Sequence, residues 1–439
     1  MSTSSGNPEP PEQSAPTPAG PDPEAEPDIS ESDTPAAEAP EPRTPAEPRT
    51  PETTEPAAPS PPRKRRRLLA AGAGTLALLL AIGSGAAWWA YHRLDSNIRT
   101  DSATTRILQR EESARPTRNP DPKTYNAKNI LLIGSDDRSG SNARYGAAGG
   151  QRSDTTILLH LSADRRRAVA VSIPRDAMVQ VPSCEKADGT RTRPQLVQFN
   201  WSFEFGGAAC TIRTVEDLTG IRIDHHLIVD FAGFKTMVDA VGGVDVCLAQ
   251  DVHDTKAKLD LTAGPHTLHG EQALGFVRLR HGIGDSSDTQ RMGRQQQFLA
   301  SLAKKVQTDG VLLNPAKLWP LLNAATSAIT TDPGLSSLSD LYDLAQSLRS
   351  IPPESMVFLT APRRPYPPDH NRDELVQPQA DMLFKALSED QPVQIVDSST
   401  TAAVSEQIQA SPSPSGSAAA PDAPLTFVGR TADQEICGR

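Results

Sequence analysis

Four short arginine-containing patches, from residue 152 to residue 296, hold the side chains with the most informative chemistry. They read RSDT (152–155), SIPRD (172–176), FVRLR (276–280) and QRMGRQQ (290–296). The arginines stand beside apolar, strand-like runs, where a partly buried guanidinium without an anion is costly. The planar fork of arginine suits phosphate oxygens. The patches therefore predict a site for a phosphoryl or pyrophosphoryl group.

Two carboxylates accompany these arginines. Asp136 and Asp154 could hold a divalent cation beside the phosphate, because oxygen ligands suit such an ion. An expected helix from about residue 288 to 306 places Arg291, Arg294 and Gln295 on one face, at i, i+3 and i+4. That face would present two guanidinium groups and an amide to a common ligand.

The elements that position these side chains are short apolar strands. Residues 129–134, 156–161 and 168–173 are β-rich runs bounded by turn signals. Asp136 follows the first strand, Asp154 precedes the second, and Arg175 follows the third. If these residues share one site, consecutive strands must be antiparallel. The sequence thus predicts an α/β fold with a mixed central β-sheet flanked by helices, an αβα sandwich.

The chain outside these elements changes character several times. The first 62 residues are dominated by Pro, Glu, Ala, Thr and Ser, and such a composition predicts disorder. The net charge of −10 owes much to this tail, so it says little about the partners of the folded part. The expected segments are a cytoplasmic tail (1–62), a basic stop and transmembrane helix (63–91), an extracellular stalk (92–124), a catalytic domain (125–395), a Ser/Ala/Pro-rich linker (396–424) and a C-terminal tail (425–439).

Residues 68–91 carry no charged side chain and are long enough to cross a bilayer once. Trp88, Trp89 and Tyr91 form an aromatic belt at the far end. Five consecutive basic residues precede the run, which predicts a cytoplasmic N-terminus and an extracellular domain. A cleaved signal is disfavoured, because the apolar run is too long and a long tail precedes it. A juxtamembrane position also explains the basic run better than nucleic-acid binding does, so no nucleic-acid partner is expected.

All four cysteines fall on the predicted outer side, where an even count favours two disulfides. Cys184 with Cys210 is the first choice, because each borders a loop of the same segment. This choice leaves Cys247 with Cys437. The sequence does not decide among the three possible pairings, and a zinc site is disfavoured because no CxxC or HExxH spacing is present.

The motifs and their order resemble those of the LytR–CpsA–Psr family of cell-envelope proteins. The likeness runs from about residue 129 to 300, and more weakly to about 390. It rests on GSDDR (134–138), RSDT, SIPRD, NWSFEFGG (200–207), VDAVGGVDV (238–246), GEQALGFVRLR (270–280) and DTQRMGRQQ (288–296). Each motif alone is weak, whereas seven in the family's order are specific.

The resemblance implies a phosphotransferase that moves a glycan from a polyprenyl-pyrophosphate carrier, the donor, onto peptidoglycan, the acceptor. It also implies that Asp136 and Asp154 hold Mg²⁺ (or Mn²⁺) on the pyrophosphate. The side chains that it assigns to gripping the pyrophosphate are Arg152, Arg175, Arg278, Arg280, Arg291, Arg294 and Gln295, with Arg138 as a further arginine. Gln198 stands where many members have lysine, a departure that could alter acceptor preference.

Several alternatives stay open at this point. The general base could be Asp136, Asp154 or Asp176. The same residues could serve a phosphohydrolase that cleaves polyprenyl pyrophosphate, with water replacing the sugar hydroxyl. A third possibility is a non-catalytic regulatory or anchoring protein that binds wall-precursor lipid, although carboxylates beside a phosphate count against it. The sequence identifies neither the polymer nor the oligomeric state.

Overall fold

The computed structural model describes residues 63–136, 153–186, 188–279, 288–308, 315–396 and 426–434. The chain divides into two units, residues 1–70 and 71–439. Helix α1 (Arg63–Asp95) begins in the first unit, and its part from Ala71 to Asp95 is long and apolar enough to cross a membrane. Everything else described below belongs to the second unit.

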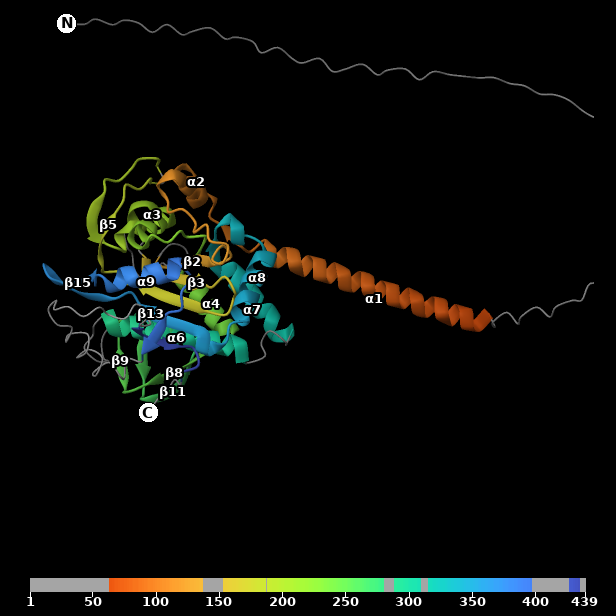
Figure 1. Ribbon diagram of the computed structural model, residues 1–439. Helices are drawn as coiled ribbons and strands as arrows, with labels where there is room; N and C mark the ends of the chain where they lie inside the picture. Colours follow the sequence, from red (N-terminus) through yellow and green to blue (C-terminus); the bar gives the residue numbers. More distant parts are fainter. Residues whose placement is uncertain are drawn as a thin grey trace, which may run out of the picture. The chain divides into compact units, whose positions relative to one another are not determined.

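The described residues of the second unit contain a nine-stranded sheet in the order β1-β12-β7-β2-β3-β4-β13-β17-β16. Its strands β2, β3 and β13 are labelled in Figure 1. The strands in that order are β1 (Arg99–Thr100), β12 (Ile329–Thr331), β7 (His225–Val229), β2 (Lys128–Ser135), β3 (Ser153–Leu161), β4 (Ala168–Ile173), β13 (Met356–Thr360), β17 (Thr426–Thr431) and β16 (Gln394–Val396). Strand β3 is antiparallel to both β2 and β4, whereas β2 is parallel to β7 and β4 is parallel to β13. The predicted mixed sheet is therefore confirmed.

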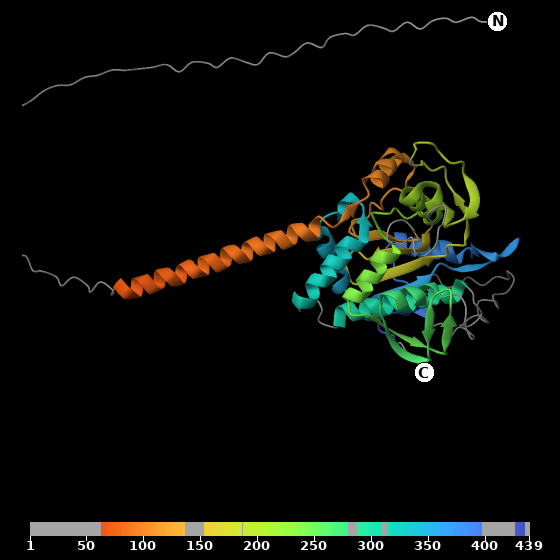
Figure 2. The same ribbon diagram turned by 180° about the vertical axis from the view of Figure 1, so that it is seen from behind.

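The central strands are apolar on both faces because helices cover both faces. Leu131 and Leu158 are fully buried in one cluster with residues of α3 and α9, while Ile130 and Ile157 are buried in another with residues of α6 and α8. Such two-sided burial explains why these strands read as continuous hydrophobic runs. The helix layers on either side of the sheet can be followed in Figures 1 and 2. The helices after α1 are α2 (Ser102–Arg110), α3 (Trp201–Thr219), α4 (Phe231–Ala240), α5 (Gly270–Arg278), α6 (Asp288–Thr308), α7 (Pro315–Ala328), α8 (Leu338–Arg349) and α9 (Gln379–Ser388), with 3₁₀ turns η1 (Glu112–Ala114), η4 (Pro333–Leu335) and η5 (Pro353–Ser355).

Among the described residues, four antiparallel strand pairs stand outside the large sheet. A third cluster of buried apolar residues joins α4, α5 and α6 to β8 and its neighbours. The pairs are β5 (Met178–Val181) with β6 (Gln195–Gln198), β8 (Val244–Leu248) with β11 (Gly264–Leu268), β9 (Val252–Asp254) with β10 (Leu259–Leu261), and β14 (Arg363–Tyr366) with β15 (Asp369–Leu375).

Residues 92–124, expected to form a stalk, instead pack on the domain. Strand β1 joins the sheet edge beside β12, and α2 packs against α3. The Asp101 side chain caps α2 by accepting a hydrogen bond from the Thr104 N–H at 3.0 Å. Leu94, Ile98 and Leu108 are buried. Since apolar residues are spaced among the polar ones, the segment buries a narrow stripe that its polar composition conceals.

Strand β17 lies in the predicted C-terminal tail, yet it enters the large sheet between β13 and β16. A Cβ atom at Gly429 would lie 2.8 Å from the Phe358 carbonyl oxygen, so glycine allows this close approach. The residues that lead into β17, 397–425, lie outside the described part of the chain. The sheet is therefore extended by a segment that was predicted to be a C-terminal tail.

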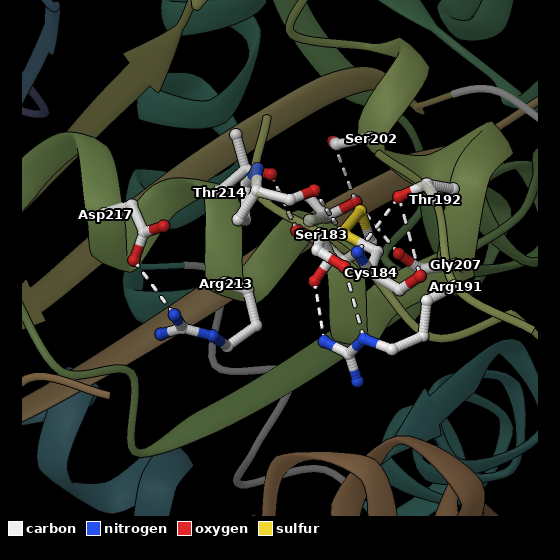
Figure 3. Close-up of a disulfide and its surroundings, with 12 residues drawn as sticks. Ser183, Cys184, Arg191, Thr192, Ser202, Gly207, Arg213, Thr214 and Asp217 are labelled. Atoms are coloured by element: carbon white, nitrogen blue, oxygen red, sulfur yellow. Dashed lines mark hydrogen bonds and ion pairs between the residues drawn. A yellow bond between two sulfur atoms is a disulfide. The ribbon is translucent and has the colours of Figure 1, made fainter. Parts of the chain in front are cut away.

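The Cys184–Cys210 disulfide is present, with Cα atoms 5.3 Å apart, as predicted (Figure 3). It ties the loop after β5 to α3, and the hydroxyl of Thr192 accepts a hydrogen bond from the Cys184 N–H at 2.9 Å. Helix α3 is kinked just before Cys210, where Gly207 has a positive φ of 61°. The second predicted pair includes Cys437, which lies outside the described residues, and it stays a prediction.

Candidate active site

An ion pair joins two of the predicted site residues at one end of the central sheet. Thr156 of β3 faces Ile173 of β4, so the residues before Thr156 and after Ile173 meet at the same sheet end. There the Nη1 atom of Arg175 donates to Oδ1 of Asp154 at 2.7 Å. Both side chains are only partly exposed. The antiparallel arrangement thus brings together two residues that are 21 positions apart in the chain.

Asp136 lies at the same sheet end. It follows β2, whose last residue Ser135 pairs with Ser153, next to Asp154 in the chain. A register shift between Gly134 and Ser135 leaves Asp154 as an additional residue in β3. Such bulges re-aim side chains and often occur beside active sites. Asp136 itself is 8% exposed, so its carboxylate is largely withdrawn from water.

Asp176 forms a second ion pair with Arg175. Oδ2 of Asp176 accepts from Nε of Arg175 at 3.3 Å, and its Oδ1 accepts from Nε2 of Gln198 at 2.7 Å. A chain of contacts therefore runs from Gln198 through Asp176 and Arg175 to Asp154. The amide of Gln198 adds no charge to this chain.

Helix α6 brings further cationic and polar side chains to the pocket. Arg291 and Gln295, one helical turn apart, are at least nine-tenths buried, and both line a pocket shared with Asp154 and Arg175. The pocket lining is Asp154, Thr155, Thr156, Ser172, Ile173, Arg175, Arg291, Met292 and Gln295. Strand ends and one helix face thus converge on one pocket.

Arg294 and Arg278 take other positions. An Nη atom of Arg294 donates to the carbonyl oxygen of Leu279, at the end of α5. The guanidinium carbon of Arg278 lies 4.8 Å from the centroid of the Phe231 ring, a cation–π arrangement. Neither side chain is among those that line the pocket. Gln295 both lines the pocket and bonds the backbone, since its Nε2 donates to the carbonyl oxygen of Val277 at 3.1 Å.

Three predicted site residues, Arg138, Arg152 and Arg280, lie outside the described residues. In the described part of the chain, no cluster of three or more His, Cys, Asp or Glu side chains suits a metal ion. The pocket also includes Thr156 and Ser172, which were not predicted as site residues. The sequence could have indicated them, because both hydroxyl residues lie near the ends of adjacent predicted antiparallel strands, and these ends meet beside Arg175.

A family model matches residues 94–389, which is most of the described part of the second unit. The chain belongs to the LytR_cpsA_psr family. The family region begins just before the end of α1 and ends at the residue after α9, so it includes β1 and α2 and excludes β16 and β17. This confirms the family that the seven motifs indicated.

Curated members of the LytR_cpsA_psr family are similar to large parts of the chain. The cell wall biosynthesis protein LcpA of Corynebacterium glutamicum is 33% identical over 263 residues, 54% of this chain and 50% of LcpA. A polyisoprenyl-teichoic acid–peptidoglycan teichoic acid transferase, TagU of Bacillus cereus, is 31% identical over 52% of this chain and 68% of TagU. The chain spans about half the length of LcpA and of its paralogue LcpB.

A solved structure supports the fold alone. Protein gbs0355 of Streptococcus agalactiae matches with a TM-score of 0.50 at 20% identity, covering 61% of this chain and 88% of that protein. The likeness agrees with a mixed sheet covered by helices on both faces.

Proposed function

We propose that this protein attaches a polyprenyl-pyrophosphate-linked glycopolymer to peptidoglycan during cell wall assembly. The observation that carries the proposal is the convergence of Arg175 and Arg291 on one pocket with Asp154 and Gln295. Two guanidinium groups that face one partly buried pocket favour an anionic ligand. The name of TagU supports transfer of a wall polymer to peptidoglycan, and the name of LcpA supports a part in cell wall biosynthesis.

The reaction would break and form one phosphorus–oxygen bond. A hydroxyl oxygen of the peptidoglycan sugar attacks the phosphorus that bears the glycan. The bond from this phosphorus to the bridging oxygen breaks, polyprenyl monophosphate departs with the electron pair, and the hydroxyl proton passes to a base. The donor already stores the free energy for transfer, so no nucleotide is needed. Positioning and charge neutralisation are what the protein supplies.

The side chains of the pocket would divide these tasks. Arg175 and Arg291 donate to the phosphoryl oxygens and stabilise the negative charge that grows on the departing phosphate. Asp176 is ill suited as the base, because both of its carboxylate oxygens already accept hydrogen bonds, from Arg175 and Gln198. Asp176 instead orients Arg175. Asp136 and Asp154 remain candidates for the base.

A divalent cation fits this donor set. Mg²⁺ in phosphate sites is held by one or two carboxylates together with substrate oxygens and water, so two aspartates at one sheet end suffice. Asp154 uses Oδ1 for Arg175 and retains a second carboxylate oxygen. Asp136 and Asp154 would hold the ion. When bound, Mg²⁺ (or Mn²⁺) would offset the negative charge of the pyrophosphate.

We further propose that α1 anchors the protein in the cell membrane. The five basic residues that open the helix favour a cytoplasmic N-terminus, which leaves the catalytic domain outside. The donor's lipid chain would then lie in the same bilayer as the anchor. This topology keeps the enzyme beside its lipid-linked donor and the wall.

The experiment is an in vitro transfer assay with the full chain in vesicles, a synthetic polyprenyl-pyrophosphoryl glycan, peptidoglycan fragments and Mg²⁺. Arg175→Ala and Arg175→Lys are compared with Arg349→Ala, which removes an exposed arginine of α8. Glycan on the acceptor that is lost in Arg175→Ala, largely lost in Arg175→Lys and kept in Arg349→Ala supports the proposal. Release of polyprenyl monophosphate without attachment indicates the phosphohydrolase instead. Tight lipid binding without any turnover indicates the regulatory protein.

A further inference from the structure

The end of α1 is built into the domain by side-chain contacts. Oδ1 of Asp95 accepts a hydrogen bond from the backbone N–H of Leu338, the first residue of α8, at 2.8 Å. Nδ2 of Asn97 donates to Oδ1 of Asn323 on α7 at 3.1 Å. Strand β1 starts two residues later and pairs with β12. The candidate membrane helix therefore passes into the sheet without a flexible linker.

Four aromatic side chains lie near this junction, and we call them the aromatic collar: Trp88, Trp89, Tyr91 and Trp319. The first three lie on α1 and are 66%, 60% and 42% exposed. Trp319 lies on α7, and its ring stacks on that of Trp89 with centroids 6.1 Å apart and planes inclined by 21°. The stack places the Trp319 side chain at the level where the apolar stretch of α1 ends in aromatic residues. Figure 2 shows α7 beside the end of α1.

The chemistry of the collar favours a lipid headgroup region over other occupants. Indole and phenol rings combine an apolar body with a polar N–H or O–H, and they concentrate where hydrocarbon meets water. His92 and Arg93, in the last turn of α1, add donors that suit lipid phosphates. Toward its N-terminus, α1 leads from the collar through the Gly, Ser and Ala residues 83–87 to the exposed Leu and Ile side chains of residues 76–82. A protein partner would not need this continuity with the apolar stretch.

We propose that the aromatic collar lies in the outer interface of the bilayer that α1 crosses, so that α7 rests on the lipid headgroups. Three contacts, Trp89 with Trp319, Asp95 with Leu338 and Asn97 with Asn323, then fix the orientation of the catalytic domain relative to the membrane. The inference rests on the membrane anchoring proposed for α1. It does not depend on the reaction, because its test measures the depth of a tryptophan in the bilayer.

The sequence offers a clean probe, since it contains only four tryptophans, Trp88, Trp89, Trp201 and Trp319. A full-length variant with Trp88→Phe, Trp89→Phe and Trp201→Phe retains Trp319 alone and keeps an aromatic ring at each position. The matched control, Trp88→Phe with Trp89→Phe and Trp319→Phe, retains Trp201 at the start of α3. Both are placed in phosphatidylcholine and phosphatidylglycerol vesicles with lipids brominated either near the headgroup or near the chain end.

We expect headgroup-proximal bromines to quench the emission of Trp319 strongly, chain-end bromines to quench it weakly, and neither to affect Trp201. Equal quenching of Trp319 and Trp201 would overturn the proposal, as would quenching of Trp319 that is strongest at the chain end. If replacing Trp201 impairs folding, the same answer comes from Trp88→Phe/Trp89→Phe with and without Trp319→Phe. The difference between these two spectra isolates Trp319 in a domain that keeps Trp201.

Discussion

Arg175 and Asp154 form an ion pair of 2.7 Å across the ends of two antiparallel strands, on the wall of the pocket that also receives Arg291 from α6. The pair has two consequences for a phosphate-binding site. It holds the guanidinium in place before substrate arrives, which lowers the cost of positioning. It also leaves the second carboxylate oxygen of Asp154 for the divalent cation that we propose.

The proposed role of Asp154 as a metal ligand gives a testable prediction. In Asp154→Asn the carboxamide keeps the shape but loses the charge that a divalent cation requires. We expect the Mg²⁺ concentration for half-maximal transfer to rise by at least about tenfold, and the maximal rate to fall by on the order of 10²-fold. A Mg²⁺ titration of the transfer rate measures both quantities. Asp188→Asn, at an exposed turn, is the control, and an unchanged Mg²⁺ dependence in Asp154→Asn would remove Asp154 from the metal site.

Asp176 is expected to act through Arg175. Removing a side chain that only orients another should cost little once the oriented side chain is gone. Asp176→Ala alone should lower kcat/KM by about tenfold to 100-fold, while adding it to Arg175→Ala should change kcat/KM very little. The four kcat/KM values of this double-mutant cycle measure the coupling. Additive losses would show that Asp176 acts independently, for example as the base.

The sequence predicts the central strands but not side-chain contacts such as the one between Gln198 and Asp176. The strands 129–134, 156–161 and 168–173 were correctly predicted because apolar β-branched runs bounded by turns carry a local signal. The pair Cys184–Cys210 was the first choice because each cysteine borders a loop of the same segment, although the sequence left three pairings open. Helical spacing placed Arg291 and Gln295 on one face of α6. Contacts such as Gln198 with Asp176 depend on a loop path, which no local pattern specifies.

Other features of the structure that the sequence does not reveal also have specific causes. Gly206 and Gly207 interrupt the helical pattern of residues 201–219, whereas the structure has them as a kink within one helix. Strand β17 was missed because its pairing partners lie far away in the sequence. Arg294 shares a helix face with Arg291 but bonds a backbone carbonyl. Helical periodicity places residues on a face without saying what each one contacts.

A buried ion pair away from the pocket should govern stability. Glu216 of α3 is fully buried and accepts from Nε and Nη2 of Arg115, at distances from 2.6 to 3.1 Å. Arg115→Ala removes a major partner of a buried carboxylate, which typically costs about 3–5 kcal/mol. Arg110→Ala, whose exposed side chain pairs with Glu185, should cost less than about 1 kcal/mol.

Denaturant unfolding of the two arginine variants measures these free energies. The variants are matched in chemistry and differ mainly in burial. Equal losses of unfolding free energy for Arg115→Ala and Arg110→Ala would contradict the structural role assigned to the pair of Arg115 with Glu216.

Acid should destabilise the junction between β1 and α2. Burial alone would raise the pKa of Asp101, but the His226 imidazole, whose Nε2 lies 3.4 Å from Oδ2 of Asp101, and hydrogen bonds from Thr104 outweigh it and lower the pKa from 3.8 to about 2. Because the folded-state pKa is depressed, this carboxylate stabilises the fold above the unfolded value of 3.8, and its contribution is lost as pH falls toward about 2.

Stability measured as a function of pH tests this linkage. Asp101→Asn keeps a side-chain oxygen to cap α2 but cannot titrate. We expect the variant to be less stable than the parent at neutral pH, and the difference to shrink between about pH 4 and pH 2. The Asp332 carboxyl, whose pKa is also lowered, remains in both proteins and adds a common slope. A stability difference that stays constant over this range would show that Asp101 does not carry the effect.

The measurement that tests the central claim most directly is the product analysis of one transfer reaction catalysed by the full chain in vesicles. The donor carries a label in the glycan and another in the polyprenyl chain, and the acceptor is a peptidoglycan fragment. The proposed function predicts that one polyprenyl monophosphate is released for each glycan joined to the acceptor through a phosphodiester. Monophosphate release with the glycan phosphate left free in solution, in the presence of acceptor, would contradict it.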